Sequence, residues 1–201
     1  MKIIRFLFSR TALLAVIATA FSSAVTQAQS VNVGWNFTDL NATFDTGTPA
    51  NFAVGNMSIA NSWGTVTTPI SAVSISSGYS GATGGGNIGN AVHNEAFSTS
   101  TSPYFTATFT PSSGYSLQVT RFDFGMRSTS TGATAYALYS SVDNYTTAIF
   151  TGTNANNSVW TLKTNPAFTL NGVVDTPVTL RLYTYGGGAT AGSGTNCCEI
   201  A

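Results

Sequence analysis

Short runs of alternating apolar and polar residues recur along the chain from residue 31 onward, and turn residues separate them. Residues 104–109 (YFTATF) and 178–182 (VTLRL) alternate most regularly. Such alternation places one set of side chains on a core and the other set on the opposite face, so each run predicts a β-strand. Further strands are predicted at residues 31–37, 52–60, 70–75, 91–97, 135–139, 149–150 and 159–162.

The spacing of these strands predicts the fold class. Strands about 8–12 residues apart, joined by turns rich in glycine, asparagine and proline, are typical of a sandwich or a barrel. Helix-forming stretches with charge pairs are nearly absent after the first 28 residues. We therefore predict an all-β chain that forms an antiparallel two-sheet sandwich, with a long glycine-rich loop at residues 78–90.

The clearest core-forming pattern lies in the segment SLQVTRFDFGM. Its first two apolar residues, Leu117 and Val119, share one parity, whereas Phe122, Phe124 and Met126 share the other. One regular strand cannot bury both sets on one face, because its side chains alternate with a period of two. Either a β-bulge between the two sets or a bend from one sheet to another resolves the conflict.

The first 28 residues have the features of a secretory signal peptide. Three basic residues accompany an apolar run at residues 11–21, which is shorter than the roughly 20 residues that a membrane-spanning helix needs. Small residues in the −3 and −1 positions predict cleavage after Ala28, and an uncleaved anchor is the alternative. We therefore predict a signal peptide at residues 1–28, one sandwich domain at residues 29–195, and no transmembrane helix in the mature chain.

Removal of the signal peptide changes the charge balance. The mature chain holds four basic and seven acidic residues, a net charge of −3, and no lysine or arginine lies between Arg10 and Arg121. Nucleic-acid binding needs clustered cations that displace condensed counterions. The charge pattern therefore excludes nucleic acid as a partner, and the abundant uncharged polar residues are typical of a secreted, extracellular β-domain.

Four short segments resemble a family of bacterial secreted domains. The segments are GYSL at residues 114–117, FDF at 122–124, ALYSSVD at 137–143 and TLRLYTYG at 179–186. The resemblance implies a jelly-roll β-sandwich of the kind found in proteins that carry a C-terminal PEP-type (PEP-CTERM) sorting tail. It also implies export to the cell surface or the medium, and it brings no catalytic residues to this chain.

The C-terminal residues depart from that family. A last strand of Arg-(Ile/Leu)-Asp-(Asn/Asp)-Val type would follow the glycine-rich residues 186–194, but residues 196–201 read NCCEIA. The prediction is that the last strand and the sorting tail are missing or altered, by a frameshift or a truncation, and that residues 196–201 form an atypical tail. Cys197 and Cys198 are adjacent, so a disulfide between them would be strained, and disulfides between chains are the alternative.

Few residues are candidates for chemistry. Gly84, Gly86 and Gly89 match a dinucleotide-binding fingerprint, but no helical pattern follows them, so we interpret the match as chance. His93, the only histidine, and Glu95 would share one face of a strand. The pair could serve as two metal ligands or as an acid and a base, and we favour a polar surface pair. No serine elbow and no paired carboxylates identify a hydrolase.

Trp63 and Asp143 are the candidate ligand-binding residues. Trp63 lies among asparagine, serine and glycine in a predicted loop, where an exposed ring can stack on a sugar, whereas Trp35 and Trp160 are assigned to core packing. Asp143 lies in a Ser-Val-Asp-Asn turn, and its carboxylate is expected to accept backbone N–H groups. Contact of Asp143 with a carbohydrate or a calcium ion is the alternative.

Together these features favour an exported, non-catalytic β-sandwich with a structural or adhesive role in the cell envelope or extracellular matrix. A carbohydrate-binding module, with or without calcium, is the first alternative, and a hydrolase fragment is the second. No catalytic residue and no cofactor is assigned, and calcium is the one candidate ion. The expected partners are extracellular polysaccharide or envelope components.

Overall fold

The regular structure of the chain consists mostly of antiparallel β-strands. The computed structural model describes residues 29–63, 70–72, 74–188 and 194–200, and it describes the last of these ranges as backbone only. Residues 31–201 form one unit. The predicted signal peptide and its cleavage site at Ala28 lie outside the described residues. The described elements are β1 (Phe52–Val54), β2 (Ser58–Ala60), β3 (Ile70–Ser71), β4 (Asn87–Val92), β5 (Tyr104–Pro111), β6 (Gln118–Val119), β7 (Phe124–Ser128), β8 (Ala135–Ser140), the 3-10 turn η1 (Ser141–Asp143), β9 (Phe150–Thr153), β10 (Thr161–Lys163), β11 (Leu170–Asn171), β12 (Val178–Tyr185) and β13 (Gly194–Ile200).

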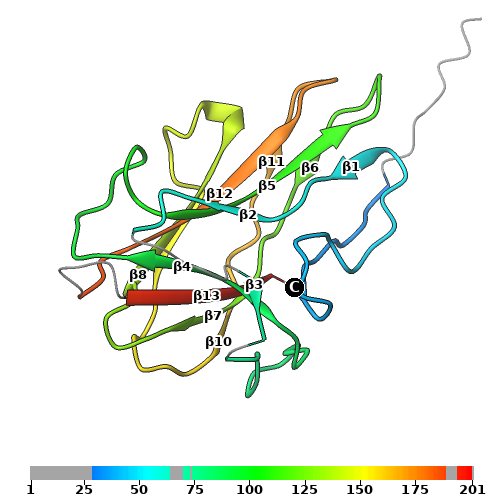
Figure 1. Cartoon of the computed structure of the whole chain (residues 1–201). Coiled ribbons are helices and arrows are strands. Elements are labelled where there is room, and N and C mark those ends of the chain that lie inside the picture. Colours follow the sequence, from blue (N-terminus) through cyan, green and yellow to red (C-terminus); the bar gives the residue numbers. More distant parts are fainter. Residues whose placement is uncertain (1–28, 64–69, 73, 189–193, 201) are drawn as a thin grey trace, which may run out of the picture. The chain divides into compact units, whose positions relative to one another are not determined.

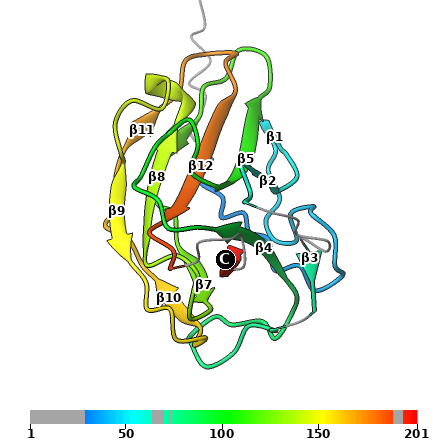
Figure 2. The same ribbon diagram turned by 60° about the vertical axis from the view of Figure 1, so that its left-hand side comes forward.

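The strands form two main sheets with jelly-roll topology. The first sheet has the order β1-β5-β12-β8-β9, with β2 also paired to β5, and the second has the order β10-β7-β13-β4-β3. Figure 2 shows β9, β8, β12 and β5 of the first sheet side by side. Between β4 and β13 the chain passes repeatedly from one sheet to the other, as in the paired Greek keys of a jelly roll. The predicted all-β, antiparallel two-sheet sandwich is confirmed.

Apolar side chains from both sheets meet in one core. In the first sheet, Leu182 of β12 lies opposite Phe105 of β5 and Leu138 of β8, and all three are buried. The second sheet contributes Ile88 and Val92 from β4 and Phe124 and Met126 from β7 to the same cluster. Burial of each such side chain contributes about 1.5–3 kcal/mol, so the core is the main source of stability.

The parity conflict in the segment SLQVTRFDFGM is resolved by a bend. β6, which includes Val119, pairs with β11 in a separate two-stranded ribbon, whereas β7, which begins at Phe124, belongs to the second sheet. Leu117 and Val119 pack from the ribbon side against the core that contains Phe124 and Met126. The chain therefore buries both sets of apolar residues by changing sheets between them.

The strand predicted at residues 31–37 is wrong, although its aromatic residues are buried as expected. The backbone N–H groups of Asn36 and Phe37 donate to Asp45 Oδ2 at 2.6 and 3.1 Å. Phe37 has a φ of 54°, which turns the chain out of an extended conformation. Because a carboxylate takes the hydrogen bonds that a neighbouring strand would take, the segment buries Trp35 and Phe37 as a loop.

The glycine-rich loop predicted at residues 78–90 is also wrong in its last part. Residues 87–90 belong to β4, a strand buried along its whole length, and the strand predicted at residues 91–97 contributes only its first two residues. Buried asparagines disguise the strand: Asn90 Nδ2 donates to Thr184 Oγ1 at 3.1 Å, and Asn87 Nδ2 donates to the Ser74 carbonyl at 3.1 Å. The glycine fingerprint thus runs into an antiparallel strand rather than a helix.

The C-terminal residues form a strand in the place where the last strand is predicted to be missing or altered. β13 pairs with β4 through residues 194–198 and with β7 through residues 196–200. Figure 1 shows β13, in red, between β4 and β7. An antiparallel ladder is made by backbone groups, so the segment can pair without the family's sequence pattern. The prediction of an atypical tail at residues 196–201 is therefore wrong for residues 196–200.

Candidate functional site

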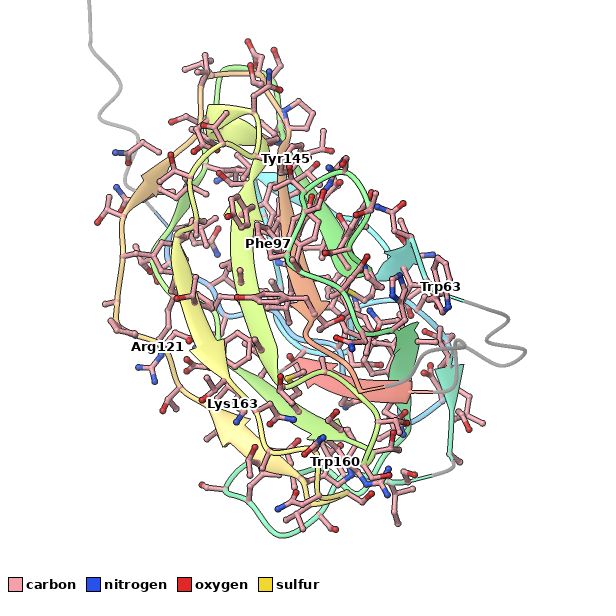
Figure 3. All side chains as sticks on the ribbon, turned by 90° about the vertical axis from the view of Figure 1, so that its left-hand side faces the viewer. Trp63, Phe97, Arg121, Tyr145, Trp160 and Lys163 are labelled. Carbon is pink, nitrogen blue, oxygen red and sulfur yellow. The ribbon has the colours of Figure 1, made fainter. Side chains whose placement is uncertain are left out.

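Trp63 lies just after β2, on a segment that runs beside β4. Its backbone N–H donates to the Ala91 carbonyl at 2.9 Å, and the Ala91 N–H donates to Ser62 Oγ at 3.0 Å. These bonds fix the backbone on which the indole is carried. The residue is 46% exposed, so the structure leaves a large apolar ring in solvent next to a fixed strand. Figure 3 labels Trp63 at the side of the molecule.

The Trp63 indole packs against the His93 ring, and His93 in turn contacts Glu95. The Trp63 and His93 rings are 3.9 Å apart between centroids, with a tilt of 54°. His93 Nε2 lies 3.1 Å from Glu95 Oε2, and both side chains are mostly buried. The predicted polar pair therefore exists, although it is mostly buried rather than on the surface, and Trp63 lies against it. We name Trp63, His93 and Glu95 the Trp63 platform.

His93 contacts both other members of the Trp63 platform. Its described partners are the Trp63 ring and the Glu95 carboxylate. Glu95 Oε1 is buried without a hydrogen-bond partner among the described residues. The geometry thus holds an exposed aromatic ring against a histidine that a carboxylate contacts in turn.

Asp143 ends η1, the turn between β8 and β9. Its Oδ2 accepts the Thr147 backbone N–H at 2.9 Å and the Thr146 hydroxyl at 3.2 Å, which is the turn-forming role predicted for it. Desolvation acts to raise the pKa of the Asp143 carboxyl, but these hydrogen bonds outweigh it and hold the pKa below the ordinary value. No described contact joins Asp143 to Trp63, so the two candidate ligand residues belong to different places.

A shallow hollow of about 250 Å³ lies beside Asp143, with Ile149, Phe168 and Leu170 among its lining residues. Pockets that enclose drug-sized ligands measure about 300–1,000 Å³, so this hollow lies below that range. Calcium takes six to eight oxygen ligands. Among the described residues, no group of three or more His, Cys, Asp or Glu side chains could hold a metal ion. The Trp63 platform is therefore the better candidate for ligand contact.

The outer face of the first sheet carries an aromatic cluster that is not predicted from the sequence. Phe97, from the loop between β4 and β5, stacks on Tyr139 with ring centroids 5.4 Å apart and also contacts Tyr183 and Tyr185. The signal was present in the sequence, because Arg181, Tyr183 and Tyr185 occupy alternate positions of a strand whose other residues are apolar or small.

The fold and the exposed ring define a jelly-roll β-sandwich with an aromatic surface platform. The described residues include no helix long and apolar enough to cross a membrane. No protein-family model matches the chain, and no curated protein matches it. Among solved structures, the chain is similar to the K1 cleaved adhesin domain of Lys-gingipain from Porphyromonas gingivalis W83, with a TM-score of 0.39 and 12% identity over 86% of this chain and 96% of that one.

Proposed function

We propose that the chain is an exported, non-catalytic adhesive module that binds extracellular polysaccharide through the Trp63 platform. The observation that carries the proposal is a tryptophan that is 46% exposed yet fixed against His93. An aromatic ring offers a flat apolar face to the C–H groups of a sugar ring, and neighbouring polar groups can bond its hydroxyls. Large exposed apolar groups on soluble proteins often mark sites of interaction.

The contacts that hold Trp63 in place support a role in ligand binding rather than exposure without a function. Its backbone is bonded to Ala91, and its ring lies against His93, which Glu95 holds in turn. A ring held in one orientation loses little conformational entropy when a ligand binds, and this lowers the cost of association. A purely structural module, the other role predicted from the sequence, would have no need of an exposed ring fixed in this way.

The test is a glycan array probed with the mature chain, recovered from the culture medium of an expressing bacterium. Mass spectrometry of that material should give Gln29 as the first residue, because cleavage is expected after Ala28. We expect the wild type to bind one class of polysaccharide. Trp63→Ala should lower the affinity at least about tenfold, the effect of losing roughly 1.4 kcal/mol at the centre of an interface.

The controls separate ring stacking from general surface effects. Trp63→Tyr keeps an aromatic face and should retain most of the binding. Val173→Ala removes another exposed apolar side chain, 68% exposed and between β11 and β12, and should change nothing. A wild-type chain that binds no polysaccharide on the array would refute the proposed function, and unchanged binding by Trp63→Ala would refute the role of the platform.

A further inference from the structure

Arg181 lies at the centre of β12, on the outer face of the first sheet. It pairs with Thr106 of β5 on one side and with Tyr139 of β8 on the other. Residues directly opposite one another in an antiparallel ladder share a face. Leu180 and Leu182, its neighbours on β12, belong to the core. The Arg181 side chain therefore projects from the face opposite the core.

Tyrosine rings hold the Arg181 guanidinium. Its central carbon lies 3.7 Å from the centroid of Tyr145 and 4.6 Å from that of Tyr104. Its Nη1 donates to the Tyr183 hydroxyl at 3.3 Å, and that hydroxyl donates to the Thr99 carbonyl at 3.1 Å. Figure 3 shows Tyr145 and Phe97 over the same sheet. The cation is thus fixed by stacking and by a hydrogen bond rather than by a carboxylate.

The charge of Arg181 is not neutralised within the described residues. The ion pairs found there join His93 to Glu95 and Arg121 to Asp123. Nε of Arg181 is buried without a hydrogen-bond partner in the described part of the chain. Burial alone would lower the pKa of the guanidinium, but the tyrosine contacts raise it, so the group stays charged. The guanidinium is therefore a fixed cation without a carboxylate partner among the described residues, and its Nε–H, unlike the rest of the group, is closed off from solvent.

We propose that Arg181, with Tyr104 and Tyr145 at its sides, binds the anionic group of an acidic polysaccharide. The group is a uronate carboxylate or a sulfate ester, since both have the oxygens that a guanidinium fork binds. Because the tyrosine rings lie against the guanidinium and its Nε is buried, the anion approaches in the plane of the group from its Nη edge. No described hydrogen bond uses the hydroxyls of Tyr104 and Tyr145, so they remain available to sugar hydroxyls.

This inference rests on the proposed function and narrows its ligand to acidic polysaccharides. The competing explanation is purely structural: stacking on Arg181 could serve only to hold Tyr145, which follows η1, against the sheet. The two explanations differ in what they predict for ligand choice. A structural role affects folding stability and leaves the discrimination between neutral and acidic polymers unchanged.

The experiment compares three polymers of galactose-type units by their binding to the mature chain: neutral galactan, polygalacturonate and a sulfated carrageenan. We expect at least one acidic polymer to bind about tenfold more tightly than galactan, the effect of one charge-assisted hydrogen-bonded contact. This preference should weaken as salt is added. Arg181→Met should abolish the preference, Arg181→Lys should retain part of it, and Arg121→Met, at an exposed arginine, should leave it intact.

A second measurement does not depend on a variant that folds. In the ¹⁵N-arginine spectrum of the wild type, the Nε–H signal of Arg181 should shift when galacturonate or galactose 6-sulfate is added and should stay in place when galactose is added. A shift with galacturonate alone identifies the bound anion as a carboxylate, and a shift with galactose 6-sulfate alone identifies it as a sulfate ester. A shift with both compounds shows that the site accepts either anion.

The outcomes separate the two proposals. If polymers bind through Trp63 but acidic ones bind no better than galactan, the Arg181 proposal is overturned and the proposed function stands. If no polymer binds, the proposed function fails and the spectrum alone decides the role of Arg181. A silent Arg181 signal, or an equal shift at Arg121, overturns the proposal, because the anion would then have no specific site at Arg181.

Discussion

At the scale of single residues, Gly125 of β7 is the position on which a loop side chain, Tyr79, packs against the second sheet. Its neighbours Phe124 and Met126 point into the core, so Gly125 faces the opposite side of β7, where Tyr79 covers it. A methyl group on Gly125 would overlap the Tyr79 hydroxyl and ring. The Tyr79 ring lies 6.3 Å from that of Trp160. The absence of a side chain at this position therefore lets the Tyr79 ring lie directly on the second sheet.

We expect Gly125→Ala to lower the free energy of unfolding by about 1–3 kcal/mol, because the added methyl group displaces the Tyr79 ring. Urea denaturation of the two proteins measures this difference. The matched control is a double-mutant cycle with Tyr79→Ala: once the ring is gone, Gly125→Ala should cost little more. Additive losses in the cycle would contradict the packing of Tyr79 on Gly125.

Residues differ in how well the sequence predicted them. Trp63 was predicted as an exposed ring because its neighbours are turn residues, and the structure confirms its exposure. The contact of Trp63 with His93 could not be predicted, because it joins segments thirty residues apart that meet only when β4 is placed. Arg181 was placed on the polar side of its strand, but its tyrosine neighbours come from β5 and from the segment after η1.

At the scale of elements, η1 depends on one carboxylate. Asp143 Oδ2 accepts the Thr147 N–H and the Thr146 hydroxyl, and these bonds hold its pKa below the ordinary value of 3.8 despite the opposing effect of desolvation. A carboxyl whose pKa is lower in the folded state adds stability above its unfolded pKa. That contribution is lost as the pH falls through the lowered folded value.

Asp143→Asn should therefore destabilise the fold at pH 7, and the difference from the wild type should shrink as the pH falls below about 4 and through the lowered pKa of the folded Asp143 carboxyl. Denaturation midpoints measured across this range provide the test. Asp39→Asn is the control, since no described hydrogen bond links a backbone N–H to that carboxylate. A difference that persists unchanged at low pH would show that the charge of Asp143 does not stabilise the turn.

Strands are predictable from the sequence where apolar and polar residues alternate regularly, and they are not predictable where this alternation is lost. The strands predicted at residues 104–109 and 178–182 are confirmed as the cores of β5 and β12. β4 was hidden because it is buried along its whole length, and its asparagines are satisfied by Thr184 and Ser74, contacts that no local pattern reveals. The strand predicted at residues 52–60 divides into β1 and β2, which both pair with β5.

At the scale of the whole molecule, β13 completes the jelly roll. It lies between β4 and β7 and pairs with both, so it is an interior strand of the second sheet. The sequence predicted the class of sandwich from the spacing of turns, but not this closure. The reason is that β13 forms by pairing its backbone with β4 and β7. The residues NCCEI have little alternation of apolar and polar side chains from which a strand could be predicted.

Removal of β13 should therefore cost far more than removal of an edge strand. Without residues 194–201, β4 and β7 would each present an unpaired row of backbone N–H and C=O groups next to the core. We expect a chain that ends at residue 193 to lose its cooperative thermal transition and to elute as aggregates in size-exclusion chromatography. Deletion of Ala201 alone is the control and should preserve both properties. A monomeric truncated chain with the wild-type melting temperature would contradict the interior position of β13, because it would show that the second sheet closes without this strand.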